Sequence, residues 1–333
     1  MLRSIMRARS GLGKPRRIVC DPAATDRSTQ MADALHDIAA LIDASKVEVG
    51  FAAIAVESGI EIAINGETLF PTASTFKVPL MVEVFAQVRA GKFKISDRIA
   101  FTEPHRVIGS GVIQALDVGL NPTIRDLMML MIIVSDNTAT DVLFDLVGPG
   151  AVTGRMRALG LENIHVPVPC HGLFRLAWNL PLEAPLGYAD FKAASKAAPM
   201  PFAGAAYARE PWNDTAASTD MARLLAMIQT REAAPAEDCA EMIALMDYQH
   251  YQDRVPRFLP LGSCANKTGS LRGLRNDTGL IRRGPGDTIA YAMFTLDTTE
   301  LPNGNSRALV EANYRIGTMM GEVGQVLWDR FGK

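Results

Sequence analysis

The chain has 333 residues, 48% of them hydrophobic, which suits a large buried core in one large domain or two closely packed ones. Its 34 basic and 36 acidic residues give a formal net charge of -2, and no basic stripe with interleaved aromatic residues is present, so nucleic acid is not an expected partner. The four cysteines stand far apart without CxxC spacing, which indicates neither a metal site nor a disulfide framework.

Residues 1–27 are rich in arginine and contain glycine and proline, and we expect a basic, flexible tail here. No apolar run of about 7 to 15 residues follows the basic positions, so the tail does not resemble a secretory signal. No run of about 18 apolar residues predicts a membrane span elsewhere. The sequence therefore predicts a cytoplasmic protein with no membrane partner, or a periplasmic one only if the start is misassigned.

Two groups of β-rich segments, one toward each end of the chain, predict a sheet. Residues 28–44 space apolar side chains as a helix does, and residues 47–56 and 61–64 form a hairpin pattern. Residues 278–295 contain two more β-rich runs joined by a turn, and residues 306–331 predict a final helix. If both ends of the chain join one antiparallel sheet, the middle is an insertion, and a cleft lies between the two layers.

The middle of the chain, residues 95–228, is mostly helical in pattern. Residues 165–212 are the exception, because they are rich in proline, alanine and glycine, and we expect a long loop with one short helix. The expected fold is α/β, an α+β sandwich in which an antiparallel sheet of about five strands is flanked by the N- and C-terminal helices and carries an inserted all-helical domain. The expected domains are a sheet domain of residues 28–70 and 229–333 and a helical domain of residues 71–228.

The segment Pro-Thr-Ala-Ser-Thr-Phe-Lys at residues 71–77 begins an apolar helix. Thr72 or Ser74 can cap this helix, which would place Ser74 and Lys77 one turn apart on one face. A lysine at a helix N-terminus is disfavoured as a cation by the helix dipole and, if buried, by desolvation. Both effects favour a neutral amine that takes the proton of Ser74, which makes a nucleophile without a histidine.

A second polar cluster, Ser135-Asp136-Asn137, lies between two predicted helices. Ser135 and Asn137 can project from this short connector into a cleft. Ser135 would relay a proton to a leaving group. Asn137 offers a donor and an acceptor, which suits a substrate amide and the Lys77 amine.

A third cluster, Lys267-Thr268-Gly269, begins a predicted strand. Lys267 can supply positive potential and Thr268 a hydroxyl for a substrate carboxylate, while Gly269 allows close backbone approach. Arg272 and Arg275 follow this cluster and are candidates to pair with a substrate carboxylate, although each is equally a solvated surface charge.

SxxK, SDN and KTG in this order resemble the class A β-lactamases and their penicillin-binding relatives. Residues 108–116, 131–141 and 213–215 also resemble class A sequence. The resemblance implies a serine hydrolase that opens a β-lactam, or a related amide or ester, through an acyl-enzyme on Ser74. It also implies a small-molecule substrate, no cofactor, and an oxyanion hole formed by the backbone amides of Ser74 and Ser270.

The sequence departs from this family in one segment. Class A enzymes carry an ExxLN motif after SDN, whose glutamate activates the water that releases the acyl group, and residues 161–175 contain no such motif. The family's usual separation leads instead to Cys170 and His171, and Glu183 begins an ExxLG segment further along. We keep His171 and Glu183 as candidate deacylation bases, beside the alternative that the loop has no dedicated base.

A missing base leaves other functions open. Lys77 and Ser74 can acylate unaided, but the loss of a base worth about 10²–10⁴-fold would leave a slowly hydrolysed acyl-enzyme. The alternatives are an intracellular amidase or esterase, an acyl transferase with little β-lactamase activity, and a slow acyl-binding protein. No feature of the sequence sets the oligomeric state.

Overall fold

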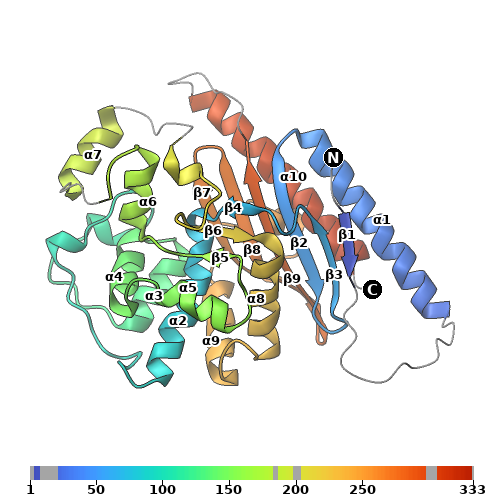
Figure 1. The fold of residues 1–333 in the computed structure, drawn as a ribbon, viewed down its shortest axis with the longest axis horizontal. Helices are drawn as coiled ribbons and strands as arrows, with labels where there is room; N and C mark the ends of the chain where they lie inside the picture. The colour runs from blue at the N-terminus through green and yellow to red at the C-terminus, as the bar shows by residue number, and fades with distance from the viewer. Residues whose placement is uncertain (1–3, 8–21, 183–186, 198–203, 298–305, 332–333) are drawn as a thin grey trace.

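The structure, a computed structural model, describes residues 4–7, 22–182, 187–197, 204–297 and 306–331. A β-sheet forms its centre, and helices cover both faces of that sheet (Figure 1). Of the expected N-terminal tail, residues 4–7 form a strand and residues 22–27 belong to a helix, and the rest lies outside the described residues. Among the described helices, none has the length and apolar character that crossing a membrane requires.

The central sheet has the strand order β1-β3-β2-β9-β8-β7, and each neighbouring pair is antiparallel. Its strands are β1 Ser4–Arg7, β2 Glu48–Ala55, β3 Ile60–Ile64, β7 Cys264–Leu271, β8 Leu274–Gly284 and β9 Asp287–Leu296. Strands β2 and β9 join the two ends of the chain, with Ala52 opposite Ala292. This pairing confirms the expected antiparallel sheet, and β1 extends it at one edge.

Two long helices, α1 (Pro22–Ser45) and α10 (Ser306–Arg330), pack side by side over one face of the sheet (Figure 1). Ile38 of α1 and Met320 of α10 are fully buried in the same cluster as Phe51 of β2. Both helices were expected from their apolar spacing. They place the N- and C-terminal segments in one layer, far from the helices that carry the polar clusters.

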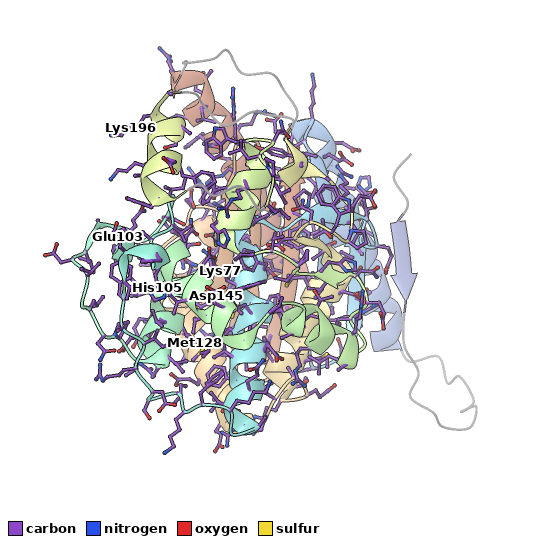
Figure 2. All side chains as sticks on the ribbon, turned by 60° about the vertical axis from the view of Figure 1, so that its left-hand side comes forward. Lys77, Glu103, His105, Met128, Asp145 and Lys196 are labelled. Atoms are coloured by element: carbon purple, nitrogen blue, oxygen red, sulfur yellow. The ribbon has the colours of Figure 1, made fainter. Side chains whose placement is uncertain are left out.

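The opposite face is covered by α8 (Ser218–Thr230), which packs on β2 and β9 with α9 (Ala236–Asp247) beside it. The remaining helices lie on the left of Figure 1 and are α2 Lys77–Arg89, α3 Ile124–Ile133, α4 Asn137–Val147, α5 Ala151–Ala158, α6 Cys170–Ala177 and α7 Tyr188–Ala197. Met128 of α3 is fully buried within this group, as Figure 2 shows. The inserted helical layer is therefore confirmed.

Several short elements were not expected. A small sheet has the order β4-β6-β5, formed by Leu69–Pro71, Thr215–Ala217 and Ile164–His165. Short 3₁₀ helices are η1 Ala73–Phe76, η2 Glu103–His105, η3 Ile113–Ala115, η4 Ala205–Tyr207 and η5 Val255–Phe258. The expectation of one short helix in residues 165–212 is wrong, because this stretch contains both α6 and α7. Elements this short carry too few residues to show a period.

The helix that follows Ser74 begins later than its apolar pattern indicates. The turn η1 comes first, and α2 begins only at Lys77. The expected side-chain cap is wrong. Thr72 is the N-cap residue of η1, but its side chain makes no capping hydrogen bond, and Thr72 Oγ1 donates instead to Asp214 O at 3.1 Å; the N-cap residue of α2 is Phe76. Pro79 lies in the first turn of α2, where its missing N–H leaves no helical hydrogen bond unmade.

Candidate active site

Ser74 lies in η1, at the N-terminal side of α2 and beside the central sheet. The backbone around it is fixed from two directions. Asn276 of β8 donates through Nδ2 to Thr72 O at 3.0 Å, and Thr72 N donates to Asp214 O at 2.9 Å. Ala73 has a φ of +44°, a conformation that side-chain-bearing residues rarely adopt. These contacts hold the serine in a constrained turn.

Strand β7 runs directly against this turn. A Cβ atom on Gly269 would lie 2.6 Å from Thr72 O and 3.1 Å from Ser74 N, so only glycine permits this separation. Thr268 and Ser270, on either side of this glycine, line the same cavity as Ser74. The sequence predicted a close approach of Gly269 to a ligand, and the close approach in the structure is made to the backbone that carries Ser74.

Lys77 is fully buried and lies in the interior of the molecule (Figure 2). Its Nζ donates to Asn137 Oδ1 at 2.8 Å, to Ser135 O at 2.8 Å and to Ser135 Oγ at 3.0 Å. The backbone N–H of Lys77 donates to Ser74 O, but among the described atoms no hydrogen bond joins the Lys77 side chain to the Ser74 side chain. Burial lowers the pKa of Lys77 below its ordinary 10.5, although the nearby Asp136 and Asp141 carboxylates oppose this shift.

Lys267 reaches the same hydroxyl from the other side. Its Nζ donates to Ser135 Oγ at 3.1 Å and to Thr268 O at 2.6 Å. Burial, followed by the positive charges of Lys77 and Arg254, lowers the pKa of Lys267 well below its ordinary value. Ser135 Oγ therefore lies between two buried amines, a position suited to proton transfer.

Asp136, the middle residue of the second cluster, has a structural role. Its Oδ1 accepts from Ala139 N at 2.9 Å and so caps α4. Its Oδ2 accepts from Val112 N at 2.6 Å and from Ile113 N at 2.9 Å. Ser135 has a φ of +56°, which turns the chain at this point. Asp136 thus ties the segment of residues 108–116 to the start of α4.

That segment contributes a cavity residue that the sequence did not single out. Ser110 Oγ donates to Ser135 O at 2.7 Å, and Asn137 Nδ2 donates to Ile108 O at 2.9 Å. A Cβ atom on Gly109 would lie 2.6 Å from Asn137 Nδ2. The resemblance of this segment to class A sequence was the signal that could have identified Ser110.

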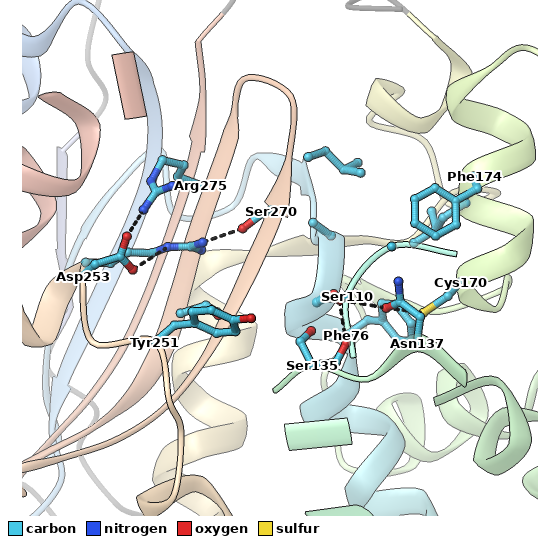
Figure 3. A pocket seen from close by; sticks show the side chains of 17 residues that line it. Phe76, Ser110, Ser135, Asn137, Cys170, Phe174, Tyr251, Asp253, Ser270 and Arg275 are labelled. Carbon is cyan, nitrogen blue, oxygen red and sulfur yellow. Dashed lines mark hydrogen bonds and ion pairs between the residues drawn. The ribbon is translucent and has the colours of Figure 1, made fainter. Parts of the chain in front are cut away.

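These groups surround a cavity of about 440 Å³, which is large enough for a small molecule (Figure 3). Of the predicted site residues, those that line it are Ser74, Ser135, Asn137, Thr268 and Ser270. Lys77 and Lys267 lie buried behind this lining and contact it through hydrogen bonds. The structure thus brings the three sequence clusters together.

Of the two candidate deacylation bases, His171 does not line this cavity. His171 Nδ1 lies 2.9 Å from Asp141 Oδ2, and His171 lines a second cavity of about 200 Å³ instead. Glu183 lies outside the described residues. Three residues of this segment line the first cavity, Cys170, Leu173 and Phe174, and Cys170 Sγ donates to Asn137 Oδ1 at 3.4 Å. Burial raises the pKa of the Cys170 thiol well above its ordinary value, so this group is neutral.

The wall opposite Ser135 carries charges that no motif marked (Figure 3). Arg254 is buried and donates through Nη1 to Gly269 O at 2.6 Å and through Nη2 to Ser270 Oγ. Arg275, one of the two expected carboxylate partners, lines the cavity and forms an ion pair with Asp253. Arg254 was missed because it lies in a segment without a recognisable motif.

The fold and this site define a class of protein. A serine in a constrained turn next to a lysine-bearing helix, with a second hydroxyl between two buried amines, is the arrangement of the β-lactamase and penicillin-binding serine hydrolases. Residues 33–331 match the model of the Beta-lactamase enzyme family, and the chain belongs to that family.

Individual relatives agree with this placement. The crystal structure of a β-lactamase from Sphaerobacter thermophilus DSM 20745 has a TM-score of 0.70 and 29% identity, covering 91% of this chain and 97% of that chain. Beta-lactamase regulatory protein BlaB of Streptomyces cacaoi is 28% identical over 259 residues, 72% of this chain and 81% of the relative. Beta-lactamase L2 of Stenotrophomonas maltophilia is 33% identical over 128 residues, 38% of this chain and 42% of the relative.

Proposed function

We propose that this β-lactamase-family hydrolase acts in the class A manner, opening a β-lactam or a related amide or ester through an acyl-enzyme on Ser74. The observation that carries the proposal is the position of Ser135 Oγ, 3.0 Å from Lys77 Nζ and 3.1 Å from Lys267 Nζ, in the cavity that Ser74 lines. A hydroxyl held between two amines of lowered pKa can receive and pass on a proton.

In the proposed acylation step, Ser74 Oγ attacks the carbonyl carbon of the substrate and its proton moves to the neutral amine of Lys77. The backbone amides of Ser74 and Ser270 would stabilise the oxyanion. The bond to the leaving nitrogen or oxygen then breaks. The leaving atom takes the proton of Ser135 Oγ, and Ser135 regains a proton from Lys77.

The remaining predicted residues would bind the substrate. Asn137 can hydrogen-bond a substrate amide, because its side chain is already fixed by Lys77 and by Ile108 O. Lys267 would supply positive potential, and the Thr268 hydroxyl would contact an acidic group on the substrate. Gly269 would bring the strand close enough for Ser270 to reach the acyl oxygen.

We further propose that the acyl-enzyme is hydrolysed slowly. Within the described lining of this cavity, the carboxylate present is that of Asp253, which is ion-paired with Arg275. Cys170 presents a neutral thiol where the family's loop would carry a base, and a thiol of raised pKa does not activate water. The name of the relative BlaB, a β-lactamase regulatory protein, adds weight to a slow acyl-binding role as the second candidate function.

The acyl-enzyme is tested by intact mass after incubation with benzylpenicillin. We expect one covalent adduct per chain, absent in Ser74→Ala and retained in Ser58→Ala, which removes an exposed serine of the turn between β2 and β3. Failure of wild-type protein to form an adduct with benzylpenicillin, a boronic acid or an activated ester would reject the proposal.

The rate of release distinguishes the two candidate functions. With nitrocefin, we expect a burst of one equivalent followed by a slow phase. The burst is expected because Lys77 and Ser135 can serve the acylation of Ser74, and the slow phase because the described lining offers no free base to activate water. Sustained turnover without a burst would favour an efficient β-lactamase and contradict the slow-release proposal.

A further inference from the structure

Three charged side chains meet on the cavity wall opposite Ser135 and Asn137 (Figure 3). Arg275 Nη2 forms an ion pair with Asp253 Oδ2, and Arg254 Nε lies 3.9 Å from Asp253 Oδ1. Both arginines and the aspartate line the same cavity as Ser74. One carboxylate of the protein therefore bridges two guanidinium groups inside the proposed substrate pocket.

Both arginines are largely buried, and hydrogen bonds hold Arg254. Arg254 Nη1 donates to Gly269 O and Asn276 O, while its Nη2 donates to Ser270 Oγ, the residue proposed to contact the substrate's acyl oxygen. The side chains of Arg254 and Arg275 are only 4% and 12% exposed. Within the described structure, the Nε atoms of both are buried without a hydrogen-bond partner. Buried guanidinium donors of this kind favour an anionic partner.

Asp253 differs from the arginines in its exposure. Its side chain is 52% exposed, so its carboxylate can reach solvent, whereas the side chains of Arg254 and Arg275 are largely buried. Two guanidinium groups and one carboxylate leave a single net positive charge on this wall. An anionic substrate group would have to displace the Asp253 carboxylate or share the arginines with it. If the two anions shared the arginines, they would lie close together and repel each other.

We propose that Asp253 is a specificity-determining residue, whose carboxylate competes with an anionic group on the acyl donor for Arg254 and Arg275. The pocket accordingly favours amides or esters that are uncharged at this end, relative to what the two arginines alone would select. This inference rests on the proposed acylation of Ser74. It concerns the residue that sets the substrate class, beyond the chemistry of the serine.

The competing explanation is that Asp253 only positions Arg275. The two explanations predict opposite changes in the binding of an anionic substrate when the Asp253 carboxylate is neutralised. Removal of a competitor strengthens the binding of an anionic substrate, whereas loss of a positioning partner weakens it.

The experiment compares Asp253→Asn with wild-type protein. The second-order rate constants for acylation are measured by quenched-flow intact mass with benzylpenicillin, which carries a carboxylate, and with its methyl ester, which does not. We expect the ratio of the benzylpenicillin rate to the ester rate to rise at least about tenfold in Asp253→Asn. Asp253→Ala should change the ratio in the same direction.

Asp247→Asn is the matched control, because it removes a carboxylate that pairs with Arg282 away from this cavity. Its ratio should equal that of wild-type protein. In the Arg275→Gln background, the gain from Asp253→Asn should shrink, since one of the two contested guanidinium groups is absent.

An unchanged or lower ratio in Asp253→Asn would overturn the inference, as would a gain of full size in the Arg275→Gln background. If both proteins form adducts but the ratio of the two rates is the same in Asp253→Asn as in wild-type protein, the acyl-enzyme proposal still holds. Absence of any adduct on wild-type protein, with either substrate, would overturn the proposed function and this inference with it.

Discussion

Lys77 has the environment expected of a proton acceptor, although its present contacts are those of a proton donor. Its Nζ has three acceptors, supplied by Ser135 and Asn137, which suit an ammonium group in the resting site. Burial nevertheless lowers the pKa of Lys77, and burial also lowers the pKa of the nearby Lys267. The lowered pKa makes it easier for Lys77 to lose a proton, and the neutral amine can then accept the proton of Ser74.

The rate of acylation of Ser74 should depend on pH. A lysine of lowered pKa is protonated and inactive as a base below that pKa, and neutral above it, so acylation of Ser74 should accelerate as the pH rises through a value below 10.5. Lys77→Met should reduce the acylation rate by about 10²–10⁴-fold and abolish this rise. The measurement is the acylation rate against pH by intact mass.

Lys92→Met is the control for this prediction, because Lys92 is an exposed lysine just beyond α2. It should retain the full rate and the same pH profile. A Lys77→Met variant that kept the wild-type pH profile would show that another group takes the proton.

Cys170 carries the second prediction. Its neutral thiol lies against Asn137 at the cavity, so a carboxylate introduced here would be the base that the described lining lacks near Ser74. Cys170→Glu should raise the steady-state rate of nitrocefin hydrolysis at least about tenfold without raising the size of the burst. Cys170→Ser, which stays neutral, should leave the slow phase unchanged, and equal gains in both variants would contradict the explanation.

At the scale of elements, the site depends on how closely β7 approaches η1. The closeness follows from the absence of a side chain at Gly269, because a Cβ atom there would meet the backbone of Thr72 and Ser74 rather than a flexible side chain. A strand that moves back would carry Ser270 away from the serine. Small displacements of reacting groups reduce rates steeply.

Gly269→Ala should therefore separate β7 from η1. We expect a loss of about 1–3 kcal/mol in the free energy of unfolding and at least about a tenfold loss in acylation rate. Gly284→Ala, at the far end of β8, is the matched control, because its Cβ would meet nothing within 4 Å. Thermal unfolding and intact-mass kinetics measure both effects, and an unchanged acylation rate in Gly269→Ala would refute the argument.

At the scale of the whole molecule, Asn276 joins parts of the chain that are distant in sequence. Its Nδ2 donates to Pro71 O at 2.8 Å and to Thr72 O at 3.0 Å, across 205 and 204 residues. Its Oδ1 accepts from Thr295 N at 2.9 Å. One buried amide thus links the central sheet to the segment that leads into Ser74.

Asn276→Ala should cost about 2–4 kcal/mol in the free energy of unfolding, because it leaves buried backbone groups without partners. Asn276→Asp should cost more, since a carboxylate oxygen would face the carbonyls of Pro71 and Thr72 in place of the amide donor. Chemical denaturation of both variants measures the difference. If Asn276→Asp, which keeps the side-chain volume, were as stable as wild-type protein, loss of volume rather than loss of the donor would explain the effect of Asn276→Ala.

The sequence alone determined two things: the helices and strands whose apolar residues recur at a regular spacing, and the residue types of the site. The apolar spacing of residues 28–44 and the β-rich runs of residues 47–64 predict their structures because each pattern is local. The three motifs likewise identified the serine, the amines and the close-approach glycine. Caps, short strands and the pair of helices α6 and α7 were not predicted, because they depend on contacts with other segments.

Only the tertiary structure decided which of these residues meet. Lys77 and Ser135 are 58 residues apart, and Ser135 and Lys267 are 132 apart, so their contacts follow from packing the helical layer on the sheet. The same packing turned His171 toward a second cavity and brought Asp253 between two arginines. A sequence pattern records which face of an element is apolar, whereas the meeting of polar side chains depends on how the elements are arranged in space.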